Sequence, residues 1–358
     1  MTQRERQLLQ WIEANPMISQ QELAERAGIT RSSVAVHISN LMKKGYIAGK
    51  GYVLRSGTYV AVAGGVNIDI CGQSYKALVQ ADSNPGYVHM SLGGVGRNIA
   101  HNLCLLGLDV RLLTALGDDL YAQQIAASCG ELGIDVSHAL QVPGGRTSTY
   151  VYLSHPNGDM ALAVSDMDVC QKITPSYLSA NLTLLNSAQV AVADANLPEE
   201  SLIYLADNCT APLFVDAVST VKAEKLRSIL GKIHTLKPNL LEAELLSGVP
   251  IRDEASLRLA ADALLSTGMH RVFISLGAKG VYAADQHQRL SLPCLPAAMV
   301  NATGAGDAFM AGLVWAYLEG TDLKNTAMAG LAAAAIAIES QKTINPAMSV
   351  TALRGKLQ

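Results

Sequence analysis

The most informative stretch of this sequence is Asn301-Ala302-Thr303-Gly304-Ala305-Gly306-Asp307, which is followed by the apolar run 308–318. The run 308–318 predicts a helix, and the small residues before it predict a loop that delivers a carboxylate to the helix start. Two glycines and an alanine leave room for a ligand, so backbone N–H groups at the positive helix end can hold an anion. An ionised Asp307 beside such an anion hole can accept a hydroxyl proton during phosphoryl transfer. The alternative is that Asp307 only caps the helix.

A second glycine-rich loop, Ser91-Leu92-Gly93-Gly94-Val95-Gly96-Arg97-Asn98, precedes a helix predicted over 98–106. It lacks the residue order and the downstream acid of a dinucleotide-binding fingerprint, which argues against NAD. The sequence also contains no GxxxxGK[ST] phosphate loop.

Short, continuous apolar runs alternate with amphipathic stretches from residue 59 onward. We predict strands at 59–63, 110–115, 190–193, 213–215, 235–236 and 272–274. Such an alternation favours an α/β domain with a mostly parallel sheet covered on both faces. Polar or glycine residues follow several of these strands, at the carboxyl edge where open α/β sheets bind ligands.

Two segments break this alternation with period-2 patterning, 83–92 and 147–164. The second contains Pro156-Asn157-Gly158-Asp159, which predicts a hairpin turn. These strands form either a lid over the carboxyl edge or an antiparallel extension of the main sheet.

Composition divides the chain in two. Of 358 residues 49% are hydrophobic and 16% are charged, which excludes a disordered chain. Residues 1–56 hold eight basic and four acidic residues, whereas the remainder holds 19 basic and 26 acidic ones. We therefore expect two domains, 1–56 and 57–358, with different partners.

The chain is also expected to be cytoplasmic. It shows neither a signal peptide nor an apolar run long enough to cross a membrane, and the Ala-rich segment 327–338 predicts a buried helix. The six cysteines are scattered without metal-ligand spacing, so we expect reduced thiols.

The basic N-terminal part predicts three helices. The first ends at Asn15-Pro16, the second follows an S-x-x-E capping box at Ser19 and closes at Gly28, and the third spans 31–44 after Thr30. The apolar face predicted for the third helix is formed by Val34, Ile38, Leu41 and Met42. The segment 45–54 reads as two short strands around a Gly-Lys-Gly turn, which would form a wing.

This pattern resembles winged helix-turn-helix domains and implies DNA binding. Side chains expected to face the major groove are Arg31, Ser32, Ser33 and His37, and those expected to meet phosphates are Lys43, Lys44 and Lys50. The alternative is a three-helix interaction or dimerisation module.

The pair of signatures Gly93-Gly94-x-x-x-Asn98 and Gly304-Ala305-Gly306-Asp307 resembles the ribokinase-like (PfkB) carbohydrate and nucleoside kinases, over about residues 59–350. The resemblance implies a ribokinase-like three-layer α/β/α domain with a small β lid. It implies ATP as phosphate donor, Mg²⁺ as its companion and a small-molecule sugar or nucleoside as acceptor. A homodimer is also expected.

The resemblance also implies roles for individual residues. The residues expected to bind the substrate are Asn67, Asp69, Gly93, Gly94 and Asn98. Asp307 is expected to be the catalytic base, and the expected anion hole is formed by Gly304, Ala305 and Gly306. The residues expected to bind ATP are Lys237, Asn239, Glu242, Ser275, Gly277, Gly280 and Asn345. Of these, Asn239 and Glu242 would act on Mg²⁺ indirectly. The alternative for Asn67, Asp69 and Glu242 is a structural role, in capping a loop or on a solvated helix face. For Asn345 a role in ATP binding and a purely structural role are equally open.

One departure from the family pattern concerns a monovalent cation. The Asp-Thr-Thr that usually precedes the GAGD segment is Asn301-Ala302-Thr303 here. K⁺ activation through Asn301 and Thr303 therefore stays a hypothesis.

The sequence is similar to pseudouridine kinases in segments around Thr149 and Asn196 and at 215–222, and this likeness implies that Thr149 and Asn196 bind the substrate. Pseudouridine is therefore the expected substrate, phosphorylated at its 5′-hydroxyl, with other nucleosides, ribose or a hexose as alternatives. A different class of function also stays open, a transcription regulator whose kinase-like domain senses a nucleoside or sugar.

Overall fold

The computed structural model describes residues 2–44, 46–47, 58–157 and 159–358, and the chain divides into two compact units, Met1–Gly57 and Thr58–Gln358. Within these ranges, no helix combines the length and apolarity that crossing a bilayer requires.

The N-terminal unit packs three helices around one small core. They are α1 (Gln3–Ala14), α2 (Gln20–Ala27) and α3 (Arg31–Lys43). Side chains from all three fill the core, among them Leu8, Leu23 and Leu41. The helix-turn-helix prediction is confirmed for the described residues, and the predicted wing, with Lys50, lies outside them.

Three details of this unit differ from expectation. Met42 is exposed rather than buried. Ser19 caps α2 through the Glu22 N–H, but the Glu22 side chain pairs with Arg26 and leaves the expected capping box half made. Lys44, expected on phosphates, instead binds the buried Glu5 carboxylate, with its Nζ 2.7 Å from one oxygen. This ion pair lowers the pKa of Glu5 to about 2.

The second unit is built on a nine-stranded sheet, in the order β15-β14-β13-β12-β11-β10-β1-β4-β6. Its strands are β1 (Tyr59–Ala63), β4 (Asp109–Leu113), β6 (Ile134–Asp135), β10 (Val190–Asp194), β11 (Leu213–Asp216), β12 (Thr235–Lys237), β13 (Arg271–Ser275), β14 (Val281–Asp285) and β15 (Arg289–Leu292). All neighbours from β13 to β6 are parallel, and β14 and β15 extend the edge antiparallel. The six predicted strands are confirmed within two residues at each end.

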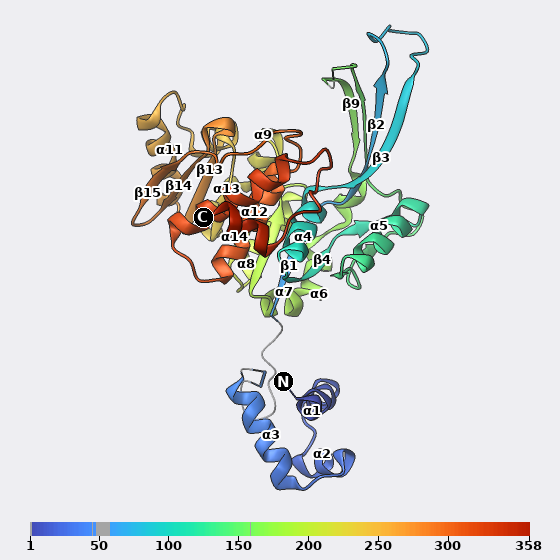
Figure 1. Ribbon diagram of the computed structural model, residues 1–358, viewed down its shortest axis with the longest axis vertical. Helices are drawn as coiled ribbons and strands as arrows, with labels where there is room; N and C mark the ends of the chain where they lie inside the picture. Colours follow the sequence, from blue (N-terminus) through green and yellow to red (C-terminus); the bar gives the residue numbers. More distant parts are fainter. Residues whose placement is uncertain (1, 45, 48–57, 158) are drawn as a thin grey trace. The chain divides into compact units, whose positions relative to one another are not determined.

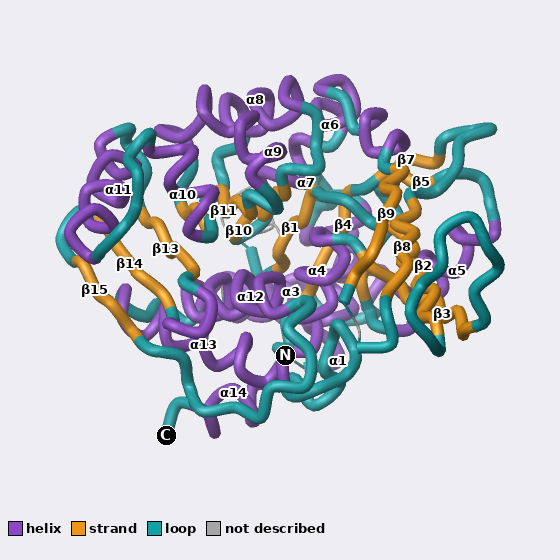
Figure 2. Tube along the Cα trace, turned by 90° about the horizontal axis from the view of Figure 1, so that it is seen from above, coloured by secondary structure: helices purple, strands orange, loops and turns teal. Residues whose placement is uncertain are grey.

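Helices cover both faces of this sheet (Figure 2). One face packs on α4 (Val95–Leu105), α5 (Leu120–Glu131), α12 (Ala305–Leu318), α13 (Leu323–Ile338) and α14 (Val350–Lys356). The other packs on α6 (Pro175–Ala180), α7 (Leu182–Ser187), α8 (Glu199–Asn208), α9 (Thr220–Ala223), α10 (Leu240–Ser247) and α11 (Glu254–Ser266). Strands buried on both faces explain the continuous apolar runs of the sequence, and the three-layer prediction is confirmed.

A separate four-stranded sheet, the lid, extends away from the main sheet (Figure 1). Its order is β3 (Gly86–Gly93), β2 (Asn67–Ser74), β8 (Thr149–Ser154) and β9 (Met160–Asp166). Because these strands pair with one another and not with the main sheet, the alternative of an edge extension is wrong. A two-stranded sheet of β5 (Ala115–Leu116) and β7 (Leu140–Gln141) lies apart from both.

The lid also brings a correction. We expected Asn67 and Asp69 in a loop after the first strand, but both lie in strand β2, one of the two inner strands of the lid. Polar residues and glycine interrupt the apolar pattern of β2, so the period-2 signal was not visible in this segment.

Candidate active site

Asp307 lies in the first turn of α12, directly after the glycine-rich loop. Gly304 caps this helix with φ 82°, a left-handed conformation that favours glycine. A Cβ atom at Gly304 would also lie 2.3 Å from the Thr343 carbonyl oxygen. The loop can therefore turn this tightly only with glycine at this position.

The two glycine-rich loops meet at Asp307. Asn98, in the first turn of α4, donates a 2.9 Å hydrogen bond from Nδ2 to Oδ2 of Asp307. Gly94 caps α4 with φ 96°, and a Cβ there would lie 2.5 Å from the Gly65 carbonyl oxygen. This close approach holds the α4 loop against the end of β1, so that residues 209 positions apart share one site.

The predicted sugar-binding residues gather beside this contact. Asn67 donates a 2.6 Å hydrogen bond to Asp69 Oδ1 and pairs across the lid with Gly93. A Cβ at Gly93 would lie 2.1 Å from Asp69 Oδ2, so glycine leaves the carboxylate room. Burial raises the pKa of Asp69, and the Asn67 hydrogen bond opposes this. The pair offers both a donor and acceptors to ligand hydroxyls.

Two carboxylates and a lysine lie at the carboxyl ends of β10, β11 and β12. Asp216 Oδ2 is 2.9 Å from Lys237 Nζ, and both residues are buried. A Cβ at Gly306 would lie 2.9 Å from the same Nζ, so the lysine stands directly beside the predicted anion hole. Asp194 accepts a 2.9 Å hydrogen bond from the Gly65 N–H and thereby fixes the end of β1. Asp194 and Asp216 are two of the polar residues that follow the predicted strands at the carboxyl edge of the sheet.

Burial and neighbouring charges both shift the pKa values of Asp307 and Lys237. Burial raises the pKa of Asp307 to about 7, and the negative charge of Asp216 adds to the shift, whereas the Asn98 hydrogen bond and Lys237 lower it. Burial alone would lower the pKa of Lys237, but the Asp216 carboxylate outweighs this and the pKa of Lys237 is raised. Asp307 therefore titrates near neutrality beside a lysine that stays charged, as a general base needs.

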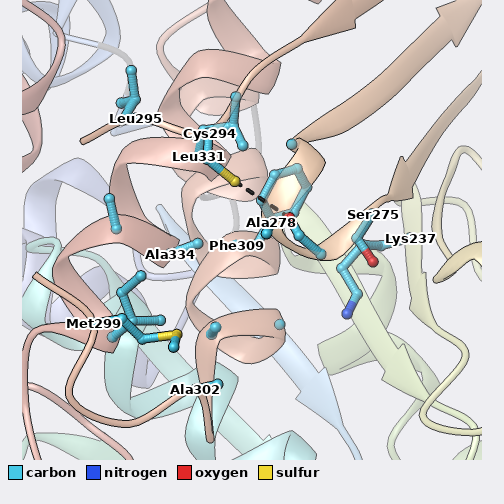
Figure 3. A pocket seen from close by; sticks show the side chains of 16 residues that line it. Lys237, Ser275, Ala278, Cys294, Leu295, Met299, Ala302, Phe309, Leu331 and Ala334 are labelled. Carbon is cyan, nitrogen blue, oxygen red and sulfur yellow. Dashed lines mark hydrogen bonds between the residues drawn. The ribbon is translucent and has the colours of Figure 1, made fainter. Parts of the chain in front are cut away.

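A cavity of about 350 Å³ opens on the other side of the anion hole (Figure 3). Lys237, Ser275, Gly277, Gly280, Ala305 and Gly306 line its polar end. The rest is apolar, formed by Cys294, Leu295, Met299, Phe309, Leu331, Ala334, Ala335 and Ile338, with Ala278 and Ala302. The polar end suits phosphates and the apolar part suits a flat base. Of the predicted ATP-binding residues, Lys237, Ser275, Gly277 and Gly280 thus meet at one cavity.

Sequence reasoning did not find the apolar lining. It comes from four segments, the turn between β13 and β14, the stretch after β15, the start of α12 and the second half of α13. The segment 327–338 was correctly predicted as a buried helix, but no pattern distinguishes an alanine facing a cavity from one facing the core.

Asn239 and Glu242 form a closed pair at the start of α10. Each caps the other, with Glu242 oxygens accepting from Asn239 N and Nδ2 at 2.8 Å and Asn239 Oδ1 accepting from Glu242 N at 2.9 Å. The described residues hold no cluster of three or more His, Cys, Asp or Glu side chains that would bind a metal directly. The predicted indirect role of this pair in Mg²⁺ binding stays a prediction.

Three other predicted residues, Asn345, Asn301 and Thr303, form hydrogen bonds within the protein. Asn345 donates a 2.6 Å hydrogen bond to the Ile336 carbonyl and accepts from the Ala347 N–H, and it does not line the cavity. It precedes α14, so it does not follow the last helix as expected. Asn301 ties its loop to the Gln341 carbonyl at 3.0 Å and accepts from the Thr303 N–H.

The two residues taken from the pseudouridine-kinase likeness both lie beside residues 65–68, the segment that contains Asn67. Thr149 pairs with Ile68 at the base of the lid. Asn196 Oδ1 accepts a short hydrogen bond from Lys222, and its side chain abuts the Cα of Gly65.

In the N-terminal unit, Arg31, Ser32 and Lys43 are exposed on α3, while Ser33 and His37 are half-buried. The Ser33 hydroxyl lies 2.8 Å from that of Thr30 at the helix start. The exposed end of α3 therefore presents charged and hydroxyl groups together.

The buried carboxylate of Asp307 lies between the polar side chains of Asn67 and Asp69 and a cavity that Lys237 lines, an arrangement that fits a kinase phosphorylating an alcohol. Comparison with known proteins agrees. Residues 57–350 match the pfkB family of carbohydrate kinases, and residues 1–48 match a winged helix-turn-helix DNA-binding family. The chain belongs to the PfkB family of ATP-dependent sugar and nucleoside kinases, with an added N-terminal winged helix-turn-helix domain.

Individual members of the family are similar to this chain over most of its length. The chain is 41% identical to the uncharacterized sugar kinase YeiI of Escherichia coli K12, over 98% of this chain and 97% of that one. It is 39% identical to pseudouridine kinase of the same organism, over 83% of this chain and 96% of that one. Among solved structures, Arabidopsis thaliana ribokinase complexed with ribose and ATP is similar with a TM-score of 0.78 at 21% identity, covering 84% of this chain and 99% of that one.

Proposed function

We propose that this kinase transfers the γ-phosphoryl group of ATP to the 5′-hydroxyl of pseudouridine. The observation that carries the proposal is the position of Asp307, bound to Asn98 on the substrate side and adjoining Gly304–Gly306 on the cavity side. The 39% identity to a pseudouridine kinase supports the choice of nucleoside.

In this proposal each residue has one task. Asn67 and Asp69 bind the ribosyl hydroxyls, and Asp307 accepts the proton of the attacking hydroxyl. Backbone N–H groups of the 304–306 loop and Lys237 Nζ hold the transferring phosphoryl group. Mg²⁺, when bound with ATP, supplies charge neutralisation at the phosphates, and Asn239 and Glu242 act on it through water. Activation by K⁺ near Asn301 and Thr303 is testable by exchanging K⁺ for Na⁺.

A substrate panel tests the proposal. Purified full-length protein with ATP and Mg²⁺ is given pseudouridine, uridine, inosine, ribose and fructose, and ADP release is measured. We expect the highest kcat/KM for pseudouridine, at least about tenfold above the others, because an acceptor that leaves one buried donor or acceptor of the site unsatisfied loses ~1–3 kcal/mol. A higher value for another acceptor would contradict the assigned nucleoside but not the kinase.

A second candidate is a regulator that senses a nucleoside or sugar, favoured by the helix-turn-helix unit alone. The retained Asp307, both glycine loops and Lys237 argue against a sensor without turnover, because binding alone needs no base. Absence of phosphoryl transfer throughout the panel would favour the sensor.

We also propose that the N-terminal unit binds DNA through α3. Full-length protein should bind DNA with an affinity that falls steeply with salt. Arg31→Ala is expected to weaken binding about 5- to 100-fold, because one base or phosphate contact is worth ~1–3 kcal/mol. Fluorescence anisotropy at several salt concentrations measures both effects.

The matched control is Arg26→Ala, since Arg26 already pairs with Glu22 on α2 at 2.8 Å. Equal DNA affinity of a fragment spanning 58–358 would refute the assignment.

We further propose a homodimer formed through one face of the lid. The alternating strands place exposed apolar side chains on a single face, the aliphatic lid face, made of Val88, Met90, Val151, Leu153, Leu162 and Val164. Such a flat apolar patch is self-complementary about a two-fold axis, and leaving it in water is unfavourable.

Leu162→Lys is expected to convert the dimer into a monomer, measured by light scattering after size-exclusion chromatography. Leu259→Lys, at a similarly exposed leucine on α11, is the control and should leave the mass unchanged. A wild-type protein that is monomeric at micromolar concentration would contradict the proposal.

A further inference from the structure

The face of the lid opposite to the aliphatic lid face is chemically different. It carries Tyr87, His89, Tyr150 and Tyr152, and we call it the aromatic lid face. Strand alternation separates the two sets completely, because successive side chains point to opposite sides of a sheet. Two faces with such different side chains serve two different contacts.

The aromatic lid face is the one that carries Asp69. In the strand register, Asp69 is paired with Tyr150, and Cys71, two residues further along β2, is paired with both Tyr152 and His89. Directly paired residues project to the same side of a sheet, with Cβ atoms about 4.5–5.5 Å apart. The aromatic rings therefore stand on the side where the proposed sugar-binding carboxylate lies.

The spacing along the strand also fits a nucleoside. Two residues along a strand span about 6.6 Å. A nucleoside whose ribosyl hydroxyls bind Asp69 and whose base points along β2 toward Cys71 would therefore bring that base beside Tyr152, the partner of Cys71. The rings of Tyr150 and Tyr152 lie 5.7 Å apart, and both side chains are half-buried, with one part still open to a ligand.

We propose that Tyr152, supported by Tyr150, is a specificity-determining residue that stacks on the base of the acceptor nucleoside. The proposal rests on the proposed nucleoside kinase function and names the part of the lid that reads the base. A sugar without a base has no flat ring to place against Tyr152, so the aromatic lid face favours nucleosides over free sugars.

The test compares a nucleoside with ribose in the full-length protein. Base stacking on an aromatic side chain contributes ~1–3 kcal/mol, so Tyr152→Leu should raise the KM for pseudouridine about 5- to 100-fold. The same variant should change kcat/KM for ribose less than about twofold, and Tyr152→Phe should retain the wild-type KM for pseudouridine. Rescue by phenylalanine shows that the ring, and not the hydroxyl, is needed.

The matched control is Tyr87→Leu, on the same face but two positions further from Asp69 along the lid. It should leave both KM values unchanged. Equal losses for pseudouridine and ribose in Tyr152→Leu would show a general effect on the lid and overturn the proposal, as would an unchanged KM for pseudouridine.

Failure of the proposed function is recognised separately. If the wild type does not phosphorylate pseudouridine, calorimetric binding of pseudouridine to wild type and Tyr152→Leu makes the same comparison without turnover. Weaker binding in the variant then supports the stacking role, and equal binding or no binding by the wild type overturns it.

Discussion

Replacing Asp307 with asparagine is expected to lower kcat about 10²- to 10⁴-fold, the usual contribution of a general base. The asparagine can keep its carbonyl oxygen toward Asn98 Nδ2, where the carboxylate now accepts a 2.9 Å hydrogen bond. Nucleoside affinity should therefore change little, because the geometry of the substrate loop is retained. Steady-state kinetics for kcat and calorimetry for the dissociation constant separate the two quantities.

The pH dependence gives a second measure of the same residue. Because burial raises the pKa of Asp307 to about 7, wild-type kcat/KM should fall below neutral pH as the carboxylate takes up a proton. Asp307→Asn should lose this limb. A wild-type profile that stays flat down to pH 5 would contradict the role of Asp307 as base.

Asp307→Asn should raise the stability of the folded protein while it lowers its activity. A raised folded-state pKa means that the folded protein holds its proton more tightly than the unfolded chain, so stability is lost as pH rises from about 4 to about 7. Asparagine removes this cost. We expect Tm of Asp307→Asn to exceed that of wild type at pH 8 and to approach it at pH 4, by scanning calorimetry.

The second large effect is expected at Gly306. Its Cβ would lie 2.9 Å from Lys237 Nζ, the flexible end of a side chain, so Gly306→Ala displaces the lysine rather than the backbone. Removing one preorganised donor from an anion site costs about 10²- to 10³-fold in kcat. The folded structure should remain as stable as before, because alanine is a better helix former than glycine.

Two other glycines provide the comparison. Gly304→Ala should lower Tm as well as kcat, because the left-handed φ and the Thr343 carbonyl at 2.3 Å both oppose a side chain. Gly355→Ala, in α14 with no described atom within 4 Å of its Cβ, should change neither. If Gly306→Ala kept full activity, Lys237 would have no part in phosphoryl transfer.

The parallel strands were readable from the sequence because both faces are buried and their apolar runs are continuous. Strand β2 was not, since Asn67, Asp69 and Gly72 serve the site and the lid rather than a core. Lys44 was assigned to phosphate because a lone lysine on a helix gives no sign of a partner 39 positions away. Asn345 is predicted to bind ATP by likeness alone, and only the structure shows that its amide joins two segments of the backbone.

The sequence alone was enough to predict the α/β class, the two-part organisation and the two glycine-rich loops, and it singled out Asp307 as the candidate base. These are local properties, because helix caps, φ preferences and strand burial leave their pattern in adjacent residues. Only the tertiary structure decided that Asn98 binds Asp307, that Lys237 stands between Asp216 and Gly306, and that the lid has an aliphatic and an aromatic face. Those facts depend on contacts between residues tens to hundreds of positions apart, and the raised pKa of Asp307 follows from the burial and the second carboxylate that only the folded chain supplies.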